Sequence, residues 1–283
     1  MGEQSEPPAG LRAADLAGLA LEELRARFGD AGEELPRGGM QALRDDPRQG
    51  ARDLAERLEK RKAALRAEQR RLDKLTEFER ALWDQGVELV GGVDEVGMAP
   101  LAGPVIAAAV ILPRGARLIG VNDSKQLTPE EREALDPQIR TLAVSWAIGR
   151  AEVEEIDKIN IYQAGLLALK RAVLGLVPQP QHLLVDARTL DLQMPQQPII
   201  KGDARSLTIG AASIVAKVHR DRLMSDLDAQ FPGYNLAGNK GYPTPDHLEA
   251  LQRLGASVLH RRSFGPVARA LGLDAESRQR SLF

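Results

Sequence analysis

The sequence contains no cysteine among its 283 residues, and this absence excludes both disulfide bonds and thiolate metal sites. Only four histidines are present, and none has the spacing typical of a zinc site. A bound metal ion would therefore have to be held mainly by oxygen atoms of carboxylates, carbonyls or water. Oxygen ligands favour Mg²⁺ or Mn²⁺.

Long apolar segments are also absent. The longest apolar run, residues 104–113, is far too short to span a bilayer, so we expect no membrane partner. The acidic start, MGEQSEPPAG, lacks the basic-then-apolar pattern of a secretion signal, which predicts a cytoplasmic protein. Nothing in the sequence demands a dimer, so we expect a monomer.

Charge is unevenly distributed although the net charge of the chain is only −2. From Lys201 to the C-terminus there are 12 Lys and Arg residues against 8 Asp and Glu, a local net charge of +4. A basic surface on this part would suit a nucleic-acid partner. A solvated surface with chance asymmetry is the alternative interpretation.

Three regions of different texture divide the chain. Residues 1–50, with several prolines and a Gly-Gly pair, indicate a weakly ordered tail with one short helical stretch. Residues 51–86 form a predicted helical extension, because leucines recur at helical spacing over residues 51–83 before Gly86. We interpret this extension as an arm packed on the main domain or on a partner. Residues 87–283 form the main domain.

The main domain begins with short Gly- and Val-rich apolar segments and then alternates between helix and strand. This order predicts an α/β fold, a mixed five-stranded sheet flanked by helices, followed by a helical C-terminal part. Thr128 and Glu131 form a capping box at the start of one helix. The expected strands are 88–96, 103–112, 142–148, 182–185 and 199–200, and the expected helices are 128–140, 161–176, 203–230 (opened by Asp203) and 243–254.

Acidic residues stand in unusually apolar surroundings at several points. Asp94 and Glu95 interrupt the apolar strand GGVDEVG, Asp186 ends the run HLLVD, and Asp221 follows the small, apolar helix face of IGAASIVAKVHRD. Carboxylates are rarely buried unless they are paired or bind a metal ion. With cysteine absent, these residues favour a carboxylate cluster for divalent ions. Two such ions can clamp a scissile phosphate, activating water and stabilising the leaving oxygen.

Longer motifs resemble bacterial ribonuclease HII. They are GGVDEVGMAPLAGPVIAAAVIL, NDSKQL, LLVDA, IIKGDARSLTIGAASIVAKVHRDRLM, KGYPTPDHLEAL and HRRSF, in that order between about residues 88 and 266. The segment from DDPRQGARDL to EFERALWDQG also resembles the helical N-terminal extension of some members. The resemblance implies a ribonuclease H-like fold and an endoribonuclease that cuts RNA–DNA hybrids and duplex DNA containing ribonucleotides.

By resemblance, the catalytic acids that bind two Mg²⁺ or Mn²⁺ ions are Asp94, Glu95, Asp186 and Asp221. The family hydrolyses the phosphodiester on the 5′ side of a ribonucleotide and leaves a 3′-hydroxyl and a 5′-phosphate. The same resemblance assigns nucleic-acid contacts to Lys125 and Tyr242. For Lys125 the alternative is a solvated side chain in a turn. Four further residues are candidates for phosphate contacts, with capping of the neighbouring helix as the alternative for the two arginines: Lys201, Lys240, Arg261 and Arg262.

One departure concerns the loop after the acidic pair. The family normally has Gly-Arg-Gly there, whereas this chain has Gly97, Met98 and Ala99. By resemblance, the loop meets the ribose 2′-hydroxyl, the group that distinguishes RNA from DNA, and the adjoining phosphates. Met98 cannot donate a hydrogen bond to phosphate as Arg does.

Two alternative functions therefore stay open. One is a nuclease that prefers hybrid tracts over single ribonucleotides because of the changed loop, and the other is a catalytically silent protein that binds hybrids. We expect no catalytic histidine, since His247 lies on a helix that looks exposed and His219 points away from Asp221.

Overall fold

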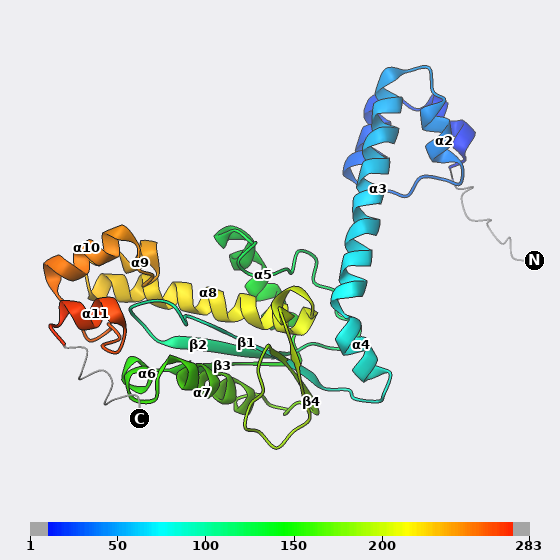
Figure 1. The fold of residues 1–283 in the computed structure, drawn as a ribbon. Helices are drawn as coiled ribbons and strands as arrows, with labels where there is room; N and C mark the ends of the chain where they lie inside the picture. The colour runs from blue at the N-terminus through cyan, green and yellow to red at the C-terminus, as the bar shows by residue number, and fades with distance from the viewer. Residues whose placement is uncertain (1–10, 274–283) are drawn as a thin grey trace, which may run out of the picture. The chain divides into compact units, whose positions relative to one another are not determined.

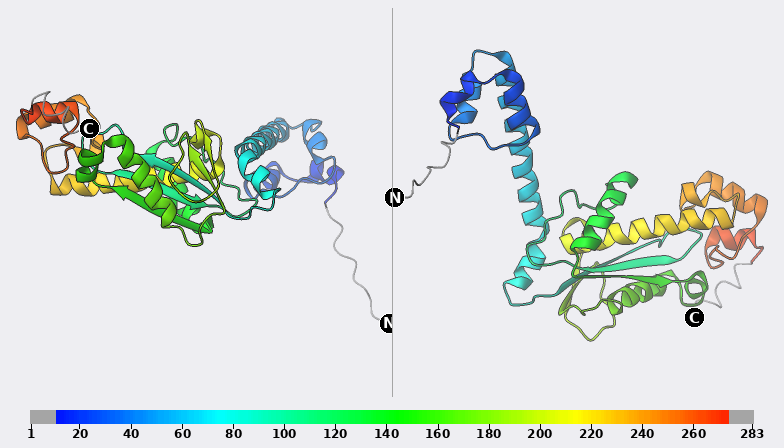
Figure 2. Two further views of the ribbon diagram at one scale, coloured as in Figure 1. Left: turned by 60° about the horizontal axis from the view of Figure 1, so that its bottom comes forward. Right: turned by 180° about the vertical axis from the view of Figure 1, so that it is seen from behind.

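The computed structural model describes residues 11–273 and divides into two compact units, Met1–Arg71 and Leu72–Phe283. Each unit is described by itself. Figures 1 and 2 show the helices and strands of both. Over residues 11–273, no helix combines the length and the apolar character needed to cross a bilayer.

The first unit is helical. Short turns surround the start of a long helix, and their apolar side chains form a small buried core with Leu24, Phe28 and Leu54 at its centre. The Asp46 carboxylate, also buried, pairs with Arg48 at 2.7 Å, and Arg48 donates to the Leu19 carbonyl at 2.6 Å. The elements are η1 (Ala13–Gly18), α1 (Leu21–Leu24), η2 (Arg25–Asp30), α2 (Gly39–Arg44) and the first turns of α3 (Gln49–Leu75).

This unit corrects the prediction that residues 1–50 are weakly ordered. Residues 11–50 are folded, and residues 1–10 lie outside the described residues. Each element is only one or two turns long, so no single segment shows a helical repeat of apolar residues. Their order comes from burial against one another and against α3, which a local pattern does not reveal.

The helix expected over residues 51–83 is instead two helices. α3 ends at Leu75, and α4 (Glu77–Trp83) begins after Thr76, whose hydroxyl bonds back to the Leu72 carbonyl at 3.0 Å. α4 belongs to the second unit. Its Leu82 and Trp83 pack with residues of the central sheet in one apolar cluster.

The second unit is built on a mixed five-stranded sheet, as the sequence predicted (Figure 1). The strand order in this sheet is β3-β2-β1-β4-β5. β1 pairs antiparallel with β2, and β2 pairs antiparallel with β3. β4 runs parallel to β1, and β5 runs parallel to β4. The strands are β1 (Val90–Val96), β2 (Val105–Ile111), β3 (Ser145–Ala151), β4 (His182–Asp186) and β5 (Gln196–Ile199).

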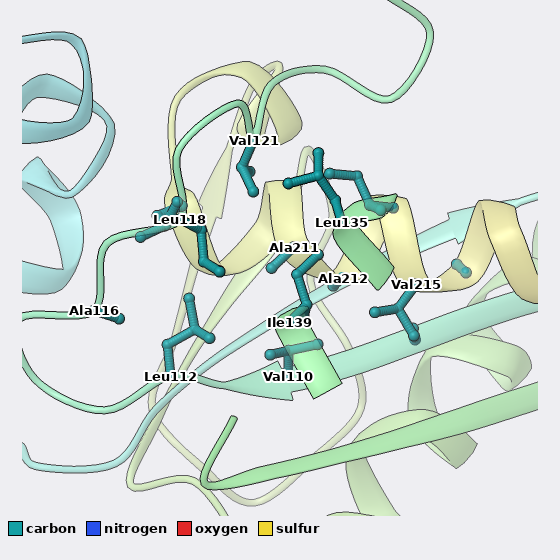
Figure 3. Close-up of a cluster of buried hydrophobic side chains, with 14 of the residues drawn as sticks. Val110, Leu112, Ala116, Leu118, Val121, Leu135, Ile139, Ala211, Ala212 and Val215 are labelled. Atoms are coloured by element: carbon teal, nitrogen blue, oxygen red, sulfur yellow. The ribbon is translucent and has the colours of Figure 1, made fainter. Parts of the chain in front are cut away.

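Helices cover both faces of this sheet (Figures 1 and 2). α8 (Leu207–Gln230) and α5 (Pro129–Leu142) lie on one face, and α7 (Ile161–Leu174) lies on the other. Alternate residues of a strand point to opposite faces, so Val110 joins the cluster under α8 while Ala109 joins the cluster under α7. Figure 3 shows the α8 side, where Leu135 and Ile139 of α5 close over Val110.

Two glycines allow the helices to approach the sheet closely. A Cβ atom at Gly92 of β1 would collide with the backbone of Thr208 in α8. A Cβ atom at Gly149 of β3 would collide with the Ala168 carbonyl of α7. Any larger residue at either position would push a helix away from the sheet.

The expected helix starting at Asp203 is wrong in its first residues. Gly202–Ala204 forms a single 3₁₀ turn (η3), and α8 begins at Leu207 after Ser206, whose side chain accepts a hydrogen bond from the Ile209 amide at 3.2 Å. The Thr128–Glu131 capping box of α5 is confirmed. Besides α6 (Val153–Ile159), three C-terminal helices gather beyond the end of α8 (Figure 1): α9 (Leu236–Asn239), α10 (Pro245–Leu254) and α11 (Gly265–Ala270).

A buried carboxylate anchors the start of α8 to α4. Glu79 is 1% exposed, and its Oε1 accepts hydrogen bonds from the Ser206 hydroxyl (2.6 Å), the Thr208 amide (2.9 Å) and the Thr208 hydroxyl (2.8 Å). The N-terminal end of a helix carries a partial positive charge, which further favours a carboxylate there. The side chain of Glu79 therefore links α4 to the start of α8 through hydrogen bonds.

Glu79→Ala should lower the free energy of unfolding by about 2–3 kcal/mol, because it leaves buried donors of Ser206 and Thr208 without an acceptor. Glu77→Ala, on an exposed position of the same helix, is the matched control and should change it by less than about 0.5 kcal/mol. Urea unfolding of both variants measures the difference. Equal stability of the two variants would contradict the anchoring role.

Candidate active site

The candidate site lies where β1 and β4 end. The two strands are parallel, and Val93 stands opposite Val185. The next residues, Asp94 and Asp186, therefore lie side by side on neighbouring strands. Both occupy the edge of the sheet at which parallel strands of an α/β protein present ligand sites.

Asp94 and Glu95 point to opposite faces of the sheet because they are consecutive in a strand. Asp94 pairs across the ladder with Ala108, whose face is covered by α8, and it lies beside the Ser213 hydroxyl of that helix. Glu95 points to the α7 side, where its Oε1 is 3.0 Å from Nη2 of Arg188.

The structure adds Asp203 as the next acid of this cluster. β5 runs parallel to β4, and Ile199 stands opposite Asp186, so the chain after Ile199 emerges at the same edge. The Gly202 amide donates to Oδ1 of Asp186 at 2.7 Å. The following residue, Asp203, is 5% exposed; its charge raises the pKa of Asp94, and the charge of Asp186 in turn raises the pKa of Asp203.

Sequence reasoning missed Asp203 because an acid at a helix start is usually a cap. The signal that could have identified it is the order of elements: IIKGD follows a strand that lies parallel to the strand of LLVD. Acids that follow neighbouring parallel strands meet at one edge.

Asp221 does not join the other acids, contrary to the expectation. It lies on α8 eight residues after Ser213, a separation of about 12 Å along the helix axis. Its carboxylate pairs with Lys217 at 2.7 Å and with Arg132 of α5 at 3.7 Å. Arg132 in turn donates to the Ser124 carbonyl at 2.8 Å. Asp221 is therefore part of the contact between α5 and α8.

Burial and mutual repulsion dominate the electrostatics of the cluster. Burial raises the pKa of Asp94 well above its ordinary value, and the neighbouring charges of Glu95, Asp186 and Asp203 raise it further. Burial also raises the pKa of Glu95 to about 7, although Arg188 counteracts the shift. Burial raises the pKa of Asp203 as well. Carboxylates in this state are stabilised in their charged form by a bound cation.

The residues present fit a divalent metal ion. All the donors are hard oxygens, and Oε2 of Glu95 is buried without a hydrogen-bond partner. As the side chains stand, no three acidic or imidazole groups among residues 11–273 converge on one point. Existing partners explain the spread, since Arg188 holds Glu95, the Gly202 amide holds Asp186, and the Lys125 Nζ lies 3.4 Å from Asp203.

Two buried arginines hold the loop that follows the acidic pair. Arg261 is 0% exposed and donates to the carbonyls of Gly97 (2.6 Å), Met98 (3.2 Å) and Gly103 (2.8 and 2.9 Å). Arg220 is 1% exposed and donates to the carbonyls of residues 102, 104 and 240 at 3.0–3.2 Å. The expected phosphate contact by Arg261 is therefore wrong, because its donors are satisfied inside the protein.

Loop residues 97–99 follow β1 directly and lie beside the acids. Gly97 has a φ of +90°, and a Cβ atom there would collide with Arg220, so only glycine fits. Met98 packs half-buried toward Gly165 of α7, and Ala99 is exposed.

The other candidate contact residues lie at the surface in different settings. Lys125 is exposed beside Asp203, and Lys201 is exposed two residues before it. Tyr242 is 38% exposed, and Gly241 next to it accepts a hydrogen bond from the Leu101 amide at 2.7 Å, so this tyrosine borders the same loop. The Lys240 Nζ bonds to the Ser225 hydroxyl at 2.8 Å. Arg262 is exposed, and its amide donates to Asp157 at 2.9 Å.

His247 is buried, contrary to its expected exposure, and belongs to a chain of hydrogen bonds. The Ser257 amide donates to Nδ1 of His260 (3.1 Å), so the proton of His260 is on Nε2, which lies 3.1 Å from Nε2 of His247. Nδ1 of His247 then donates to the Tyr242 carbonyl at 2.8 Å. Two neutral imidazoles thus fix the backbone at Tyr242.

The fold and the acid cluster together define a nuclease of the ribonuclease H-like class. The structure is similar to that of ribonuclease H2 from Pyrococcus horikoshii OT3, with a TM-score of 0.57 and 27% identity over 68% of this chain and 99% of the other. Ribonucleases of this class act with divalent metal ions.

The chain belongs to the ribonuclease HII family. Residues 91–267 match the family model of ribonuclease HII, and residues 21–83 match that of the ribonuclease HII N-terminal domain. Ribonuclease HII of Anaeromyxobacter sp. (strain Fw109-5) is 58% identical over 93% of this chain and 84% of its own length. That of Myxococcus xanthus (strain DK1622) is also 58% identical, over 91% and 89%. The protein is thus a ribonuclease H enzyme, an endoribonuclease that degrades RNA in hybrids.

The histidine chain predicts a loss of stability in acid. Burial, and then the neighbouring His247, lower the pKa of His260 from 6.5 to about 4. The unfolded chain binds this proton more readily, so stability is full above pH 6.5 and falls as the pH drops toward 4. Between pH 7 and pH 5 the contribution of His260 to the free energy of unfolding should fall by about 2 kcal/mol.

His260→Asn should remove this contribution, because an amide does not titrate in this range. Urea unfolding of both proteins at pH 7 and pH 5 measures it. The variant is expected to be less stable at pH 7 but to lose less stability on acidification. Parallel losses in the two proteins would contradict a neutral, buried His260.

Proposed function

We propose that this protein cuts the phosphodiester on the 5′ side of a ribonucleotide by two-metal-ion hydrolysis, leaving a 3′-hydroxyl and a 5′-phosphate. Its substrates are RNA–DNA hybrids and duplex DNA that contains ribonucleotides. The observation that carries the proposal is that Asp94, Glu95, Asp186 and Asp203, all buried or half-buried, gather at one edge of the sheet. Carboxylates withdrawn from water in this way are typical of sites for hard cations.

These four acids would hold Mg²⁺ or Mn²⁺, with Asp203 in the place that the sequence had suggested for Asp221. Two bound ions would supply Lewis-acid chemistry, polarising the phosphate, activating water and neutralising the leaving oxygen. Lys125, whose Nζ lies 3.4 Å from Asp203, is placed to bind a phosphate close to the acids. It would position the duplex without reading its sequence.

The loop of residues 97–99 supports recognition through its backbone. Arg261 binds the carbonyls of Gly97 and Met98, and the N–H of a trans peptide points opposite to its carbonyl. The amides of Met98 and Ala99 therefore point away from Arg261. They remain suited to donate to a ribose hydroxyl or a phosphate, and neither donor depends on the side chain at these positions.

Asp203→Asn should lower the rate of hybrid cleavage roughly a hundred-fold or more, because it weakens the binding of the metal ion on which the chemistry depends. Asp221→Asn should keep the rate within about three-fold, since that residue contacts α5 and not the cluster. Asp94→Asn serves as the positive control for loss of activity. Single-turnover cleavage of a labelled hybrid with Mg²⁺ measures all three.

Circular dichroism and thermal unfolding of the same variants separate a lost site from a lost fold. If Asp221→Asn abolished cleavage in a folded protein while Asp203→Asn cut normally, the assignment of the fourth acid would have to be reversed.

The substrate range is tested with two labelled duplexes, one with a single ribonucleotide in DNA and the other with a short run of ribonucleotides. We expect cleavage of both on the 5′ side of a ribonucleotide, with Mg²⁺ and with Mn²⁺, because the loop acts through its amides. Duplex DNA of the same sequence is the control and should not be cut.

Cleavage of the run alone would favour the alternative of a nuclease that prefers hybrid tracts. That alternative is motivated by Met98 and Ala99, which stand where the family normally has Arg and Gly. Binding of both duplexes without any cleavage would instead favour a silent hybrid-binding protein.

A further inference from the structure

Among residues 11–273, Arg188 is the one guanidinium paired with an acid of the cluster. It follows Asp186 by two residues, and Ala187 between them has a φ of +49°, a left-handed turn that redirects the chain after β4. Nη2 of Arg188 lies 3.0 Å from Oε1 of Glu95, and the two side chains are 21% and 10% exposed. Neither the sequence pattern nor the proposed function gives Arg188 a role.

The pair is incomplete on both sides. Arginine and a carboxylate commonly form two parallel hydrogen bonds, but here Nη1 of Arg188 and Oε2 of Glu95 are both buried without a partner. The free oxygen of Glu95 is explained by a metal ion. The free N–H group of Arg188 calls for an acceptor that the described part of the chain does not provide.

Two partly exposed side chains lie over the guanidinium of Arg188. Its centre is 5.2 Å from the ring of Tyr162, which is 53% exposed. Nη1 of Arg188 and Sδ of Met98 each lie 3.0 Å from the position that a Cβ atom would take at Gly165, so both atoms border the same point of α7. A thioether is a weak acceptor on a flexible side chain. Rotation of Met98 would open space at this point, beside the loop of residues 97–99.

Arg188 differs in this respect from the two other arginines near the loop. Arg220 and Arg261 are fully buried, and their guanidinium groups are occupied by backbone carbonyls. Residues 97–99 carry no cationic side chain themselves. Of the three arginines described at this loop, Arg188 is thus the one with a donor that lacks an acceptor.

We propose that Arg188 is a substrate-binding residue, with Nη1 donating to a phosphate oxygen of the RNA-containing strand while Nη2 stays on Glu95. The inference rests on the proposed function, which brings a phosphate to the acid cluster. A guanidinium suits this task because it is always charged and offers several donors in a fixed plane. Phosphate supplies the acceptor that Nη1 lacks.

The competing explanation is that Arg188 only positions Glu95. Arg188→Gln and Glu95→Gln break the same pair, so metal-free binding of a labelled hybrid separates the two explanations. We expect Arg188→Gln to weaken binding roughly ten-fold and to reduce the slope of log K against log salt by about one, since one phosphate contact is lost. Glu95→Gln should bind at least as tightly as the unaltered protein, because it removes a negative charge near the phosphate.

Two further variants complete the test. Arg171→Gln breaks a comparable ion pair between α7 and α6, Arg171–Glu155 at 2.7 Å. This variant is expected to leave the slope of log K against log salt unchanged. Arg188→Lys keeps a cation and should recover the slope but only part of the affinity.

Equal effects of Arg188→Gln and Glu95→Gln, or an unchanged slope in Arg188→Gln, would overturn the proposal and leave Arg188 as a positioning residue. Cleavage of the hybrid by the unaltered protein with Mg²⁺ is measured alongside. If that protein neither bound nor cut the hybrid, the proposed function itself would fail, and the role of Arg188 with it.

Discussion

The contact between α8 and β1 is the constraint on which the site depends. Gly92 lets the backbone of Thr208 lie directly on the strand, and this contact fixes the height of the whole helix over the sheet. The turn before α8 then brings Asp203 to the acids, and Ser213 meets Asp94. Further along, Arg220 reaches the loop after β1. Glu79 holds the first turn of this helix in place, so α4 supports the site without touching it.

Buried charged side chains near the site are of two kinds, arginines bound to carbonyl groups and carboxylates close to other carboxylates. Arg220 and Arg261 are buried with carbonyl partners, which satisfy their donors without bringing a carboxylate into the interior. The acids at the strand ends are buried close to one another, which raises the pKa of Asp94 and Glu95. The first arrangement stabilises a loop, whereas the second leaves repulsion between carboxylates that a bound cation would relieve. The donors of the two arginines are thus satisfied within the protein, and the charges of the acids are only partly compensated.

Local patterns in the sequence predicted the strands, the capping box at Thr128 and the acids of two neighbouring strands, because each depends on residues close in sequence. Local patterns did not show that Asp203, and not Asp221, lies with the other acids. Both residues follow apolar segments, and only the parallel pairing of β4 with β5 decides which of them reaches the site. The predictions for Arg261 and His247 were wrong for the same reason, because their hydrogen-bond partners are distant in sequence. Arg261 binds the carbonyl of Gly97, more than a hundred residues earlier, and His247 contacts His260, about a dozen residues later. Residues 11–50 fold through contacts among short turns that carry no repeat of their own.

The loop of residues 97–99 has a shape that does not depend on its own side chains. Its shape is set from within, by the positive φ of Gly97 and by Arg261 on two successive carbonyls, and neither feature depends on the side chain of Met98. The outward amides keep their direction as long as those carbonyls are held. What a side chain at residue 98 could add is a positive charge, and Arg188 holds one near that position from the segment after β4. Backbone geometry and charge at this loop are therefore supplied by separate parts of the fold, so each can change without the other.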